Sequence, residues 1–115
     1  MDRPPYRERP FEQRRAEFLK IIASRPEYTA VILERRGRHT PVIDKQKFLV
    51  PKSLTCGQFL YVIRKRMSIG REQSLFLLSS SVTLASQELV GDVAAKRADE
   101  DGFLYIAYCV ENTFG

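Results

Sequence analysis

The stretch that most constrains the fold runs from residue 47 to residue 66 and reads KFLVPKSLTCGQFLYVIRKR. It opens on a strand whose side chains alternate between two faces, as the period of two requires. Pro51 ends that strand because proline has no N–H for a ladder and suits an edge. Thr55 and Gln58 fit the S/T-x-x-E/Q capping box, which predicts a helix from about Cys56. The stretch therefore predicts an edge strand, a proline corner and a helix that together make a groove.

The predicted helix has one apolar stripe and a basic end. Residues at helical spacing that should make the buried stripe are Phe59, Val62, Ile63 and Met67. The last turns read RKR at 64–66, where the helix dipole favours cations. The helix should reach about residue 67, and Gly70 can stop it.

The N-terminal part begins with a polar lead and continues as a second helix. Pro4 and Pro5 cannot sit inside a helix, so the first ten residues should be a loosely held lead with room for a short helical turn. A helix is predicted from residue 11 to about residue 24, and Pro26 ends it. Its apolar face is expected to hold Phe11, Phe18, Ile21 and Ile22.

Three further stretches read as strands. Residues 28–34 and 103–108 are apolar on both faces, which predicts central strands covered on both sides. The first should form an antiparallel hairpin with 47–50, and 75–78 reads as a short buried strand followed by a serine turn. Residues 87–97 predict a short helix weakened by Gly91, and the acidic run at 99–101 predicts a solvated turn.

The length, composition and charge of the chain narrow the kinds of protein it can be. A chain of 115 residues, 43% hydrophobic, fits one globular domain, and no apolar run is long enough to predict a transmembrane helix. The polar N-terminus does not predict a secretory signal, and two cysteines predict no disulfide framework, so a reducing cytosol is expected. The net charge of +5 is uneven, because residues 1–85 carry +9 and residues 86–115 carry −4. A basic front of this kind predicts acidic partners or an anionic membrane surface.

The residues predict no intrinsic catalysis. Cys56 at a helix start has no spacing that ties it to His39, so it is interpreted as a small residue filling space. The sequence holds no metal-ligand cluster and no phosphate-cradling glycine motif, so neither metal nor cofactor is predicted. The basic run at 64–66 is interpreted as a solvated helix end, and no nucleic acid is expected as a partner.

Five blocks in order carry a resemblance to a known family. They are RPFE-x-RR at 9–15, KFLVP at 47–51, LT-x-GQF at 54–59, IRKR at 63–66 and FLYIAY at 103–108. The chain resembles the GABARAP-type ubiquitin-like modifiers of autophagy, the autophagy-related protein eight family. The resemblance implies an α+β, ubiquitin-like β-grasp with a four-stranded mixed sheet and an additional N-terminal helical subdomain. The expected parts are a helical extension at 1–26, the β-grasp core at 27–110 and a flexible tail at 111–115.

The resemblance also implies a groove with two hydrophobic pockets for an aromatic-x-x-aliphatic peptide on cargo receptors. The positions matching the first pocket are Glu17, Ile21, Ala30, Ile32, Lys47, Leu49 and Phe103. Those matching the second are Phe48, Val50, Pro51, Leu54, Phe59, Val62 and Ile63. An extended peptide would add as a strand beside 47–50, and Lys45, Lys47 and Arg66 would attract its acidic flanks. The alternative, that these residues are only core, is stronger for Ile32 and Phe59 than for Leu49.

Gly115 matches the family's conjugating glycine, which implies attachment to phosphatidylethanolamine. The implied partners are an activating and a conjugating enzyme with catalytic cysteines, and a cysteine protease that processes and deconjugates the modifier. The implied location is the cytoplasm, and the autophagosome membrane once lipid is attached. Residues beyond Gly115, removed by the protease, are usual in the family.

Two other functions stay open from the sequence. One is a basic adaptor in vesicle trafficking or tubulin binding that is never conjugated, and the other is a modifier of protein lysines. Some residues depart from the family pattern. Ala30 replaces a common proline, Tyr28 replaces a frequent basic residue and Gly102 replaces a common aromatic residue. These differences are expected to affect which partners bind.

Overall fold

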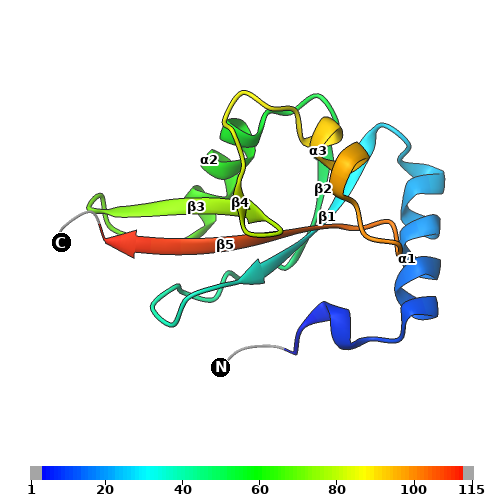
Figure 1. The fold of residues 1–115 in the computed structure, drawn as a ribbon, viewed down its shortest axis with the longest axis horizontal. Helices are drawn as coiled ribbons and strands as arrows, with labels where there is room; N and C mark the ends of the chain where they lie inside the picture. Colours follow the sequence, from blue (N-terminus) through cyan, green and yellow to red (C-terminus); the bar gives the residue numbers. More distant parts are fainter. Residues whose placement is uncertain (1–3, 113–115) are drawn as a thin grey trace.

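The computed structural model describes residues 4–112 of the chain (Figure 1). The helical elements are η1 (Tyr6–Glu8), α1 (Phe11–Ser24), α2 (Cys56–Arg66) and α3 (Val90–Arg97). The strands are β1 (Tyr28–Arg35), β2 (Lys47–Pro51), β3 (Gln73–Ser79), β4 (Val82–Thr83) and β5 (Leu104–Asn112). The predicted helices, the hairpin of β1 with β2 and the strands later in the chain are confirmed.

The strands form one mixed sheet in the order β2-β1-β5-β3-β4. β1 and β5 lie side by side in parallel at the centre, with Ile32 opposite Tyr105. The other neighbours pair antiparallel, and Ile32 on its other side lies opposite Lys47 of β2. The predicted α+β class is confirmed, but the sheet has five strands and not four, because Val82 and Thr83 pair with the end of β3.

Both faces of the central strands are covered, as their doubly apolar sequences predict. Val31 and Leu33 of β1 point into the main core, which α2 and α3 cover with residues such as Ile63 and Val90. The alternate residues, Ala30 and Ile32, point the other way into a smaller cluster with the N-terminal segment. In Figure 1, α2 and α3 lie above the sheet and η1 lies below it.

The start of α2 is fixed locally by the predicted capping box. The Gln58 amide N–H donates to Thr55 Oγ1 at 3.1 Å, and the Thr55 N–H donates to Gln58 Oε1 at 2.9 Å. The predicted buried stripe is wrong at Val62, which is 43% exposed. Residues along a helix turn by about 100° each, so Val62 lies on the flank of the arc that buries Phe59 and Ile63.

Three other predictions fail in detail. The predicted apolar face of α1 is wrong at Phe11, which is exposed, and no residue of this helix is fully buried. Phe18 and Ile21 are the residues of this face that pack against the smaller cluster on the sheet. α2 ends at Arg66, one residue before the expected end at 67, so Gly70 is not the residue that stops it. β5 continues past residue 108, and its last residue, Asn112, pairs with Gln73 of β3. The described part of the expected flexible tail is therefore strand, while Gly115 lies outside the described residues.

Candidate functional site

β2 lies at one end of the sheet and pairs only with β1, so its outer edge has no strand beside it within residues 4–112. Its side chains alternate: Phe48 and Val50 are buried, whereas Leu49 and Pro51 are exposed. A strand of this kind can pair with an added extended segment through its backbone. The exposed Leu49 would lie under such a segment.

The structure brings together the residues that match the first pocket. Glu17 and Ile21 come from α1, Ala30 and Ile32 from β1, Lys47 and Leu49 from β2, and Phe103 directly precedes β5. Glu17 accepts a hydrogen bond from the ammonium of Lys47, which joins α1 to β2. The floor of this pocket is closed, because Ala30, Ile32 and Phe103 are at most 1% exposed.

The residues that match the second pocket divide into core and surface. Phe48, Val50, Phe59 and Ile63 are buried in the main core. Leu54 is half-buried, and Pro51 and Val62 are exposed. The interpretation of Ile32 and Phe59 as core is confirmed, and the surface available to a ligand consists of Leu49, Pro51, Leu54 and Val62.

The three predicted cations lie near this surface, and two already have acidic partners. Arg66 makes a forked contact with Asp44 at 3.0 and 3.1 Å. Lys47 pairs with Glu17. The Lys45 ammonium lies 5.0 Å from the centre of the Phe48 ring. An acidic peptide would therefore compete with Asp44 and Glu17 for these cations.

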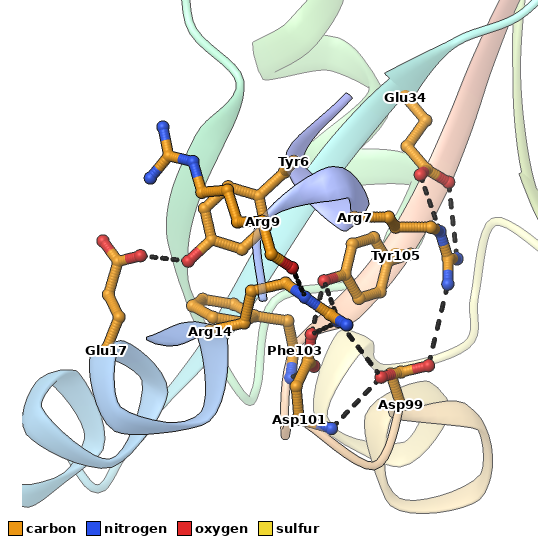
Figure 2. A network of polar contacts seen from close by, with 10 residues as sticks. All are labelled: Tyr6, Arg7, Arg9, Arg14, Glu17, Glu34, Asp99, Asp101, Phe103 and Tyr105. Atoms are coloured by element: carbon orange, nitrogen blue, oxygen red, sulfur yellow. Dashed lines mark hydrogen bonds and ion pairs between the residues drawn. The ribbon is translucent and has the colours of Figure 1, made fainter. Parts of the chain in front are cut away.

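A polar network that the sequence did not predict holds the N-terminal segment to the sheet (Figure 2). Asp101 is its centre: the carboxylate is 0% exposed and accepts from Arg14 at 2.5 Å, from the Tyr105 hydroxyl at 2.5 Å and from the Phe103 N–H at 2.8 Å. The expectation of a solvated turn is therefore wrong at Asp101, because Arg14 from the distant α1 reaches it. Nothing local in the run Asp99–Asp101 distinguishes the buried carboxylate from its neighbours.

A second missed residue is Tyr6, whose side chain is 2% exposed. Its hydroxyl donates to Glu17, and its ring meets the Phe103 ring edge-on with 5.3 Å between centres. The sequence does offer a signal, because Tyr6 is the only large aromatic residue in the polar, proline-rich lead. The prediction of a loosely held lead is wrong at this residue.

The environment shifts the pKa of several groups. Burial raises the pKa of the Tyr6 hydroxyl above its usual range, and the hydrogen bond to Glu17 adds to this. Burial raises the pKa of the Tyr105 hydroxyl in the same way, helped by Asp101. Burial also raises the pKa of the Cys56 thiol, as does nearby Glu88, so this cysteine is not activated as a nucleophile.

Glu17 makes the contact between α1 and β2 dependent on pH. Burial tends to raise the pKa of the Glu17 carboxyl, but hydrogen bonds from Lys47 and Tyr6 outweigh it and hold the pKa below 4.5. The contribution of the ionised Glu17 carboxylate to the free energy of unfolding is therefore fully present above pH 4.5. It is lost as the pH falls through the lowered pKa of Glu17. We expect the free energy of unfolding of the wild type to fall more steeply than that of Glu17→Gln below about pH 4.5. Urea unfolding across pH measures this difference, and parallel curves would contradict it.

No candidate metal centre or membrane span is found in the described range. Residues 4–112 contain no group of three or more His, Cys, Asp or Glu side chains placed to hold an ion. No helix in that range is long and apolar enough to cross a membrane. Two cavities of about 430 and 200 Å³ lie away from the candidate groove, and none of the predicted groove residues lines either one.

Comparison with known proteins agrees with the predicted family. The family profile described as "Autophagy protein Atg8 ubiquitin like" matches residues 13–115. Autophagy-related protein 8b of Arabidopsis thaliana is 45% identical over 107 residues, covering 92% of this chain and 88% of that protein. Autophagy-related protein 8 of Mycosarcoma maydis is 45% identical over 109 residues, covering 94% of this chain and 92% of that protein.

A solved structure gives the same result for the fold. The crystal structure of Trypanosoma brucei ATG8 superposes with a TM-score of 0.87 at 36% identity, and the match covers 100% of both chains. The mixed sheet with helices on both faces is thus the ubiquitin-like fold that the family resemblance implied. The chain belongs to the Atg8 family of ubiquitin-like autophagy proteins.

Proposed function

We propose that this chain is conjugated through Gly115 to phosphatidylethanolamine on autophagosomal membranes and recruits cargo receptors there through the groove beside β2. The observation that supports the groove is the outer edge of β2, which has no strand beside it within residues 4–112 and carries the exposed Leu49. Lys45 and Arg66 lie over the ring of the adjacent Phe48. An aromatic-x-x-aliphatic peptide with acidic flanks fits this arrangement, because backbone pairing supplies affinity and the side chains supply specificity.

The conjugation step is supported by family membership and by the residue type at the terminus. The Gly115 carboxylate would be adenylated by ATP with release of pyrophosphate, then transferred to an enzyme cysteine with release of AMP. The amine of phosphatidylethanolamine would attack the thioester, forming an amide and releasing the thiol. Glycine has no Cβ, so the tail can enter a narrow enzyme cleft. The two acyl chains of the product would anchor stably, whereas one chain binds only marginally.

Deletion of Gly115 is expected to abolish conjugation and to leave peptide binding unchanged. The reconstituted reaction contains the activating and conjugating enzymes, ATP and liposomes with phosphatidylethanolamine, and mass spectrometry follows the lipid adduct. The full chain is the positive control. If the deletion variant still becomes membrane-bound and resists extraction by high salt, the conjugation proposal is wrong and the adaptor without conjugation takes its place.

Leu49→Ala is expected to weaken binding of an aromatic-x-x-aliphatic peptide by at most about 1.5–3 kcal/mol, the range for burying a leucine side chain. Lys47→Ala should weaken it mainly at low salt, because exposed charges are screened. Calorimetric titration measures both. Leu19→Ala is a matched control, since Leu19 is an exposed leucine on α1. Affinities unchanged in both groove variants would place the binding site elsewhere.

A further inference from the structure

Tyr6 packs against the residues that match the first pocket. Its ring packs in one cluster with Ala30, Ile32 and Phe103. The Lys47 ammonium lies 5.5 Å from the centre of the ring, and the Arg9 guanidinium lies 4.8 Å from it. The Tyr6 hydroxyl donates to Glu17. The chain thus places its own aromatic side chain on the residues that match the aromatic pocket of the groove.

This packing is incompatible with a second aromatic ring at the same place. Ala30, Ile32 and Phe103 have at most 1% of their surface exposed, and Phe18, Ile21 and Tyr6 pack over them, so an incoming ring can touch them only if part of this cover moves. Tyr6 is the part that the short η1 carries. Protein interiors are packed without room for an added ring, so one aromatic must leave for the other to enter. The exposed Leu49 and Val62, in contrast, need no rearrangement to contact a ligand.

The segment that carries Tyr6 is held in a way that allows it to leave. η1 has only three residues, and its backbone bonds are local: the Glu8 N–H donates to Pro5 O at 3.0 Å and the Arg9 N–H donates to Tyr6 O at 3.1 Å. Arg7 bonds to Glu34 at 2.8 Å, but its side chain is 49% exposed. Exposed ion pairs contribute little to stability, so the contacts that a ligand must replace are those of the Tyr6 side chain and the bond from Arg14 Nε to Arg9 O at 2.9 Å.

We propose that η1 is a lid on the first pocket: Tyr6 fills the pocket in the free protein, and an aromatic-x-x-aliphatic peptide binds by displacing it. This inference rests on the proposed peptide groove and adds its regulation. The same peptide would separate Lys47 from Glu17, because its acidic flank competes for the Lys47 ammonium. Displacement of Tyr6 and release of Lys47 are therefore coupled through Glu17, which bonds to both.

The lid scales the apparent affinity by the fraction of time that it is open. If the open state is populated to about 10%, the apparent Kd is about tenfold weaker than that of the open pocket. Tyr6→Ala is therefore expected to tighten binding roughly tenfold. Tyr6→Phe keeps the ring and removes only the bond to Glu17, so its effect should be smaller. Tyr61→Ala, which truncates an exposed tyrosine on α2, is the matched control and should change nothing.

The test uses the full chain and a synthetic acidic peptide with the motif Phe-x-x-Leu, titrated by calorimetry against the wild type and these three variants. Amide hydrogen exchange of the wild type gives a readout without any mutation. Peptide binding should speed exchange at Glu8 and Arg9, whose N–H groups close the turn, and slow it along β2.

The outcomes separate the lid from the groove. Tighter binding by Tyr6→Ala together with faster exchange in η1 supports the lid. Equal binding by the wild type and Tyr6→Ala, with η1 equally or better protected in the complex, overturns the lid and leaves the groove intact. If neither the wild type nor Tyr6→Ala binds the peptide, the groove fails and the lid fails with it. Binding by Tyr6→Ala alone indicates a lid that is almost always closed.

Discussion

Replacing Asp101 by alanine is expected to lower the free energy of unfolding by about 3 kcal/mol, because it leaves two buried donors without an acceptor at about 1–3 kcal/mol each. The donors are the Phe103 N–H and the Tyr105 hydroxyl, which lie 2.8 and 2.5 Å from the carboxylate. The variant also removes the partner of Arg14 and thereby loosens α1 from the sheet. Urea unfolding measures the loss.

Glu100→Ala is the matched control, since Glu100 precedes Asp101 in the same turn and is exposed. A surface substitution of this kind usually changes stability by less than about 0.5 kcal/mol. Asp101→Asn keeps an oxygen acceptor and should recover part of the loss. A stability of Asp101→Ala close to that of Glu100→Ala would contradict the central role of this carboxylate.

The elements that the sequence predicts well are those set by nearby residues. The capping box of Thr55 and Gln58 is local, so the start of α2 follows from the sequence. The apolar runs of β1 and β5 predict their central positions because both faces must be covered. β4 is different: Val82 and Thr83 are too few to show a period, and only pairing with β3 makes them a strand.

The burial of single side chains in the candidate site depends on contacts between distant parts of the chain. Asp101 is buried because Arg14, far earlier in the sequence, bonds to it. Tyr6 is buried because Phe103 and Glu17 receive it. The family resemblance predicted the groove positions, and the structure brings them together. The resemblance does not imply that Tyr6 covers the first pocket. That closure results from side-chain packing, which no local pattern encodes.

Replacing Phe103 by alanine is expected to cost about 3–5 kcal/mol in the free energy of unfolding, the usual range for truncating a buried phenylalanine. Its ring is fully buried and meets two others edge-on, Tyr6 at 5.3 Å and Phe18 at 5.5 Å between centres. Such contacts add stability beyond the area they bury. The loss should therefore include the docking of both η1 and α1.

Phe76→Ala separates this effect from the general cost of removing a phenylalanine. Phe76 lies on β3 and is 37% exposed, so its truncation leaves no closed cavity and should cost clearly less. Hydrogen exchange distinguishes local from global effects: Phe103→Ala should speed exchange in α1 and η1 more than in β3, because Phe103 packs under the N-terminal segment. An equal loss of stability in the two variants would show that the N-terminal segment does not depend on Phe103 for its place on the sheet.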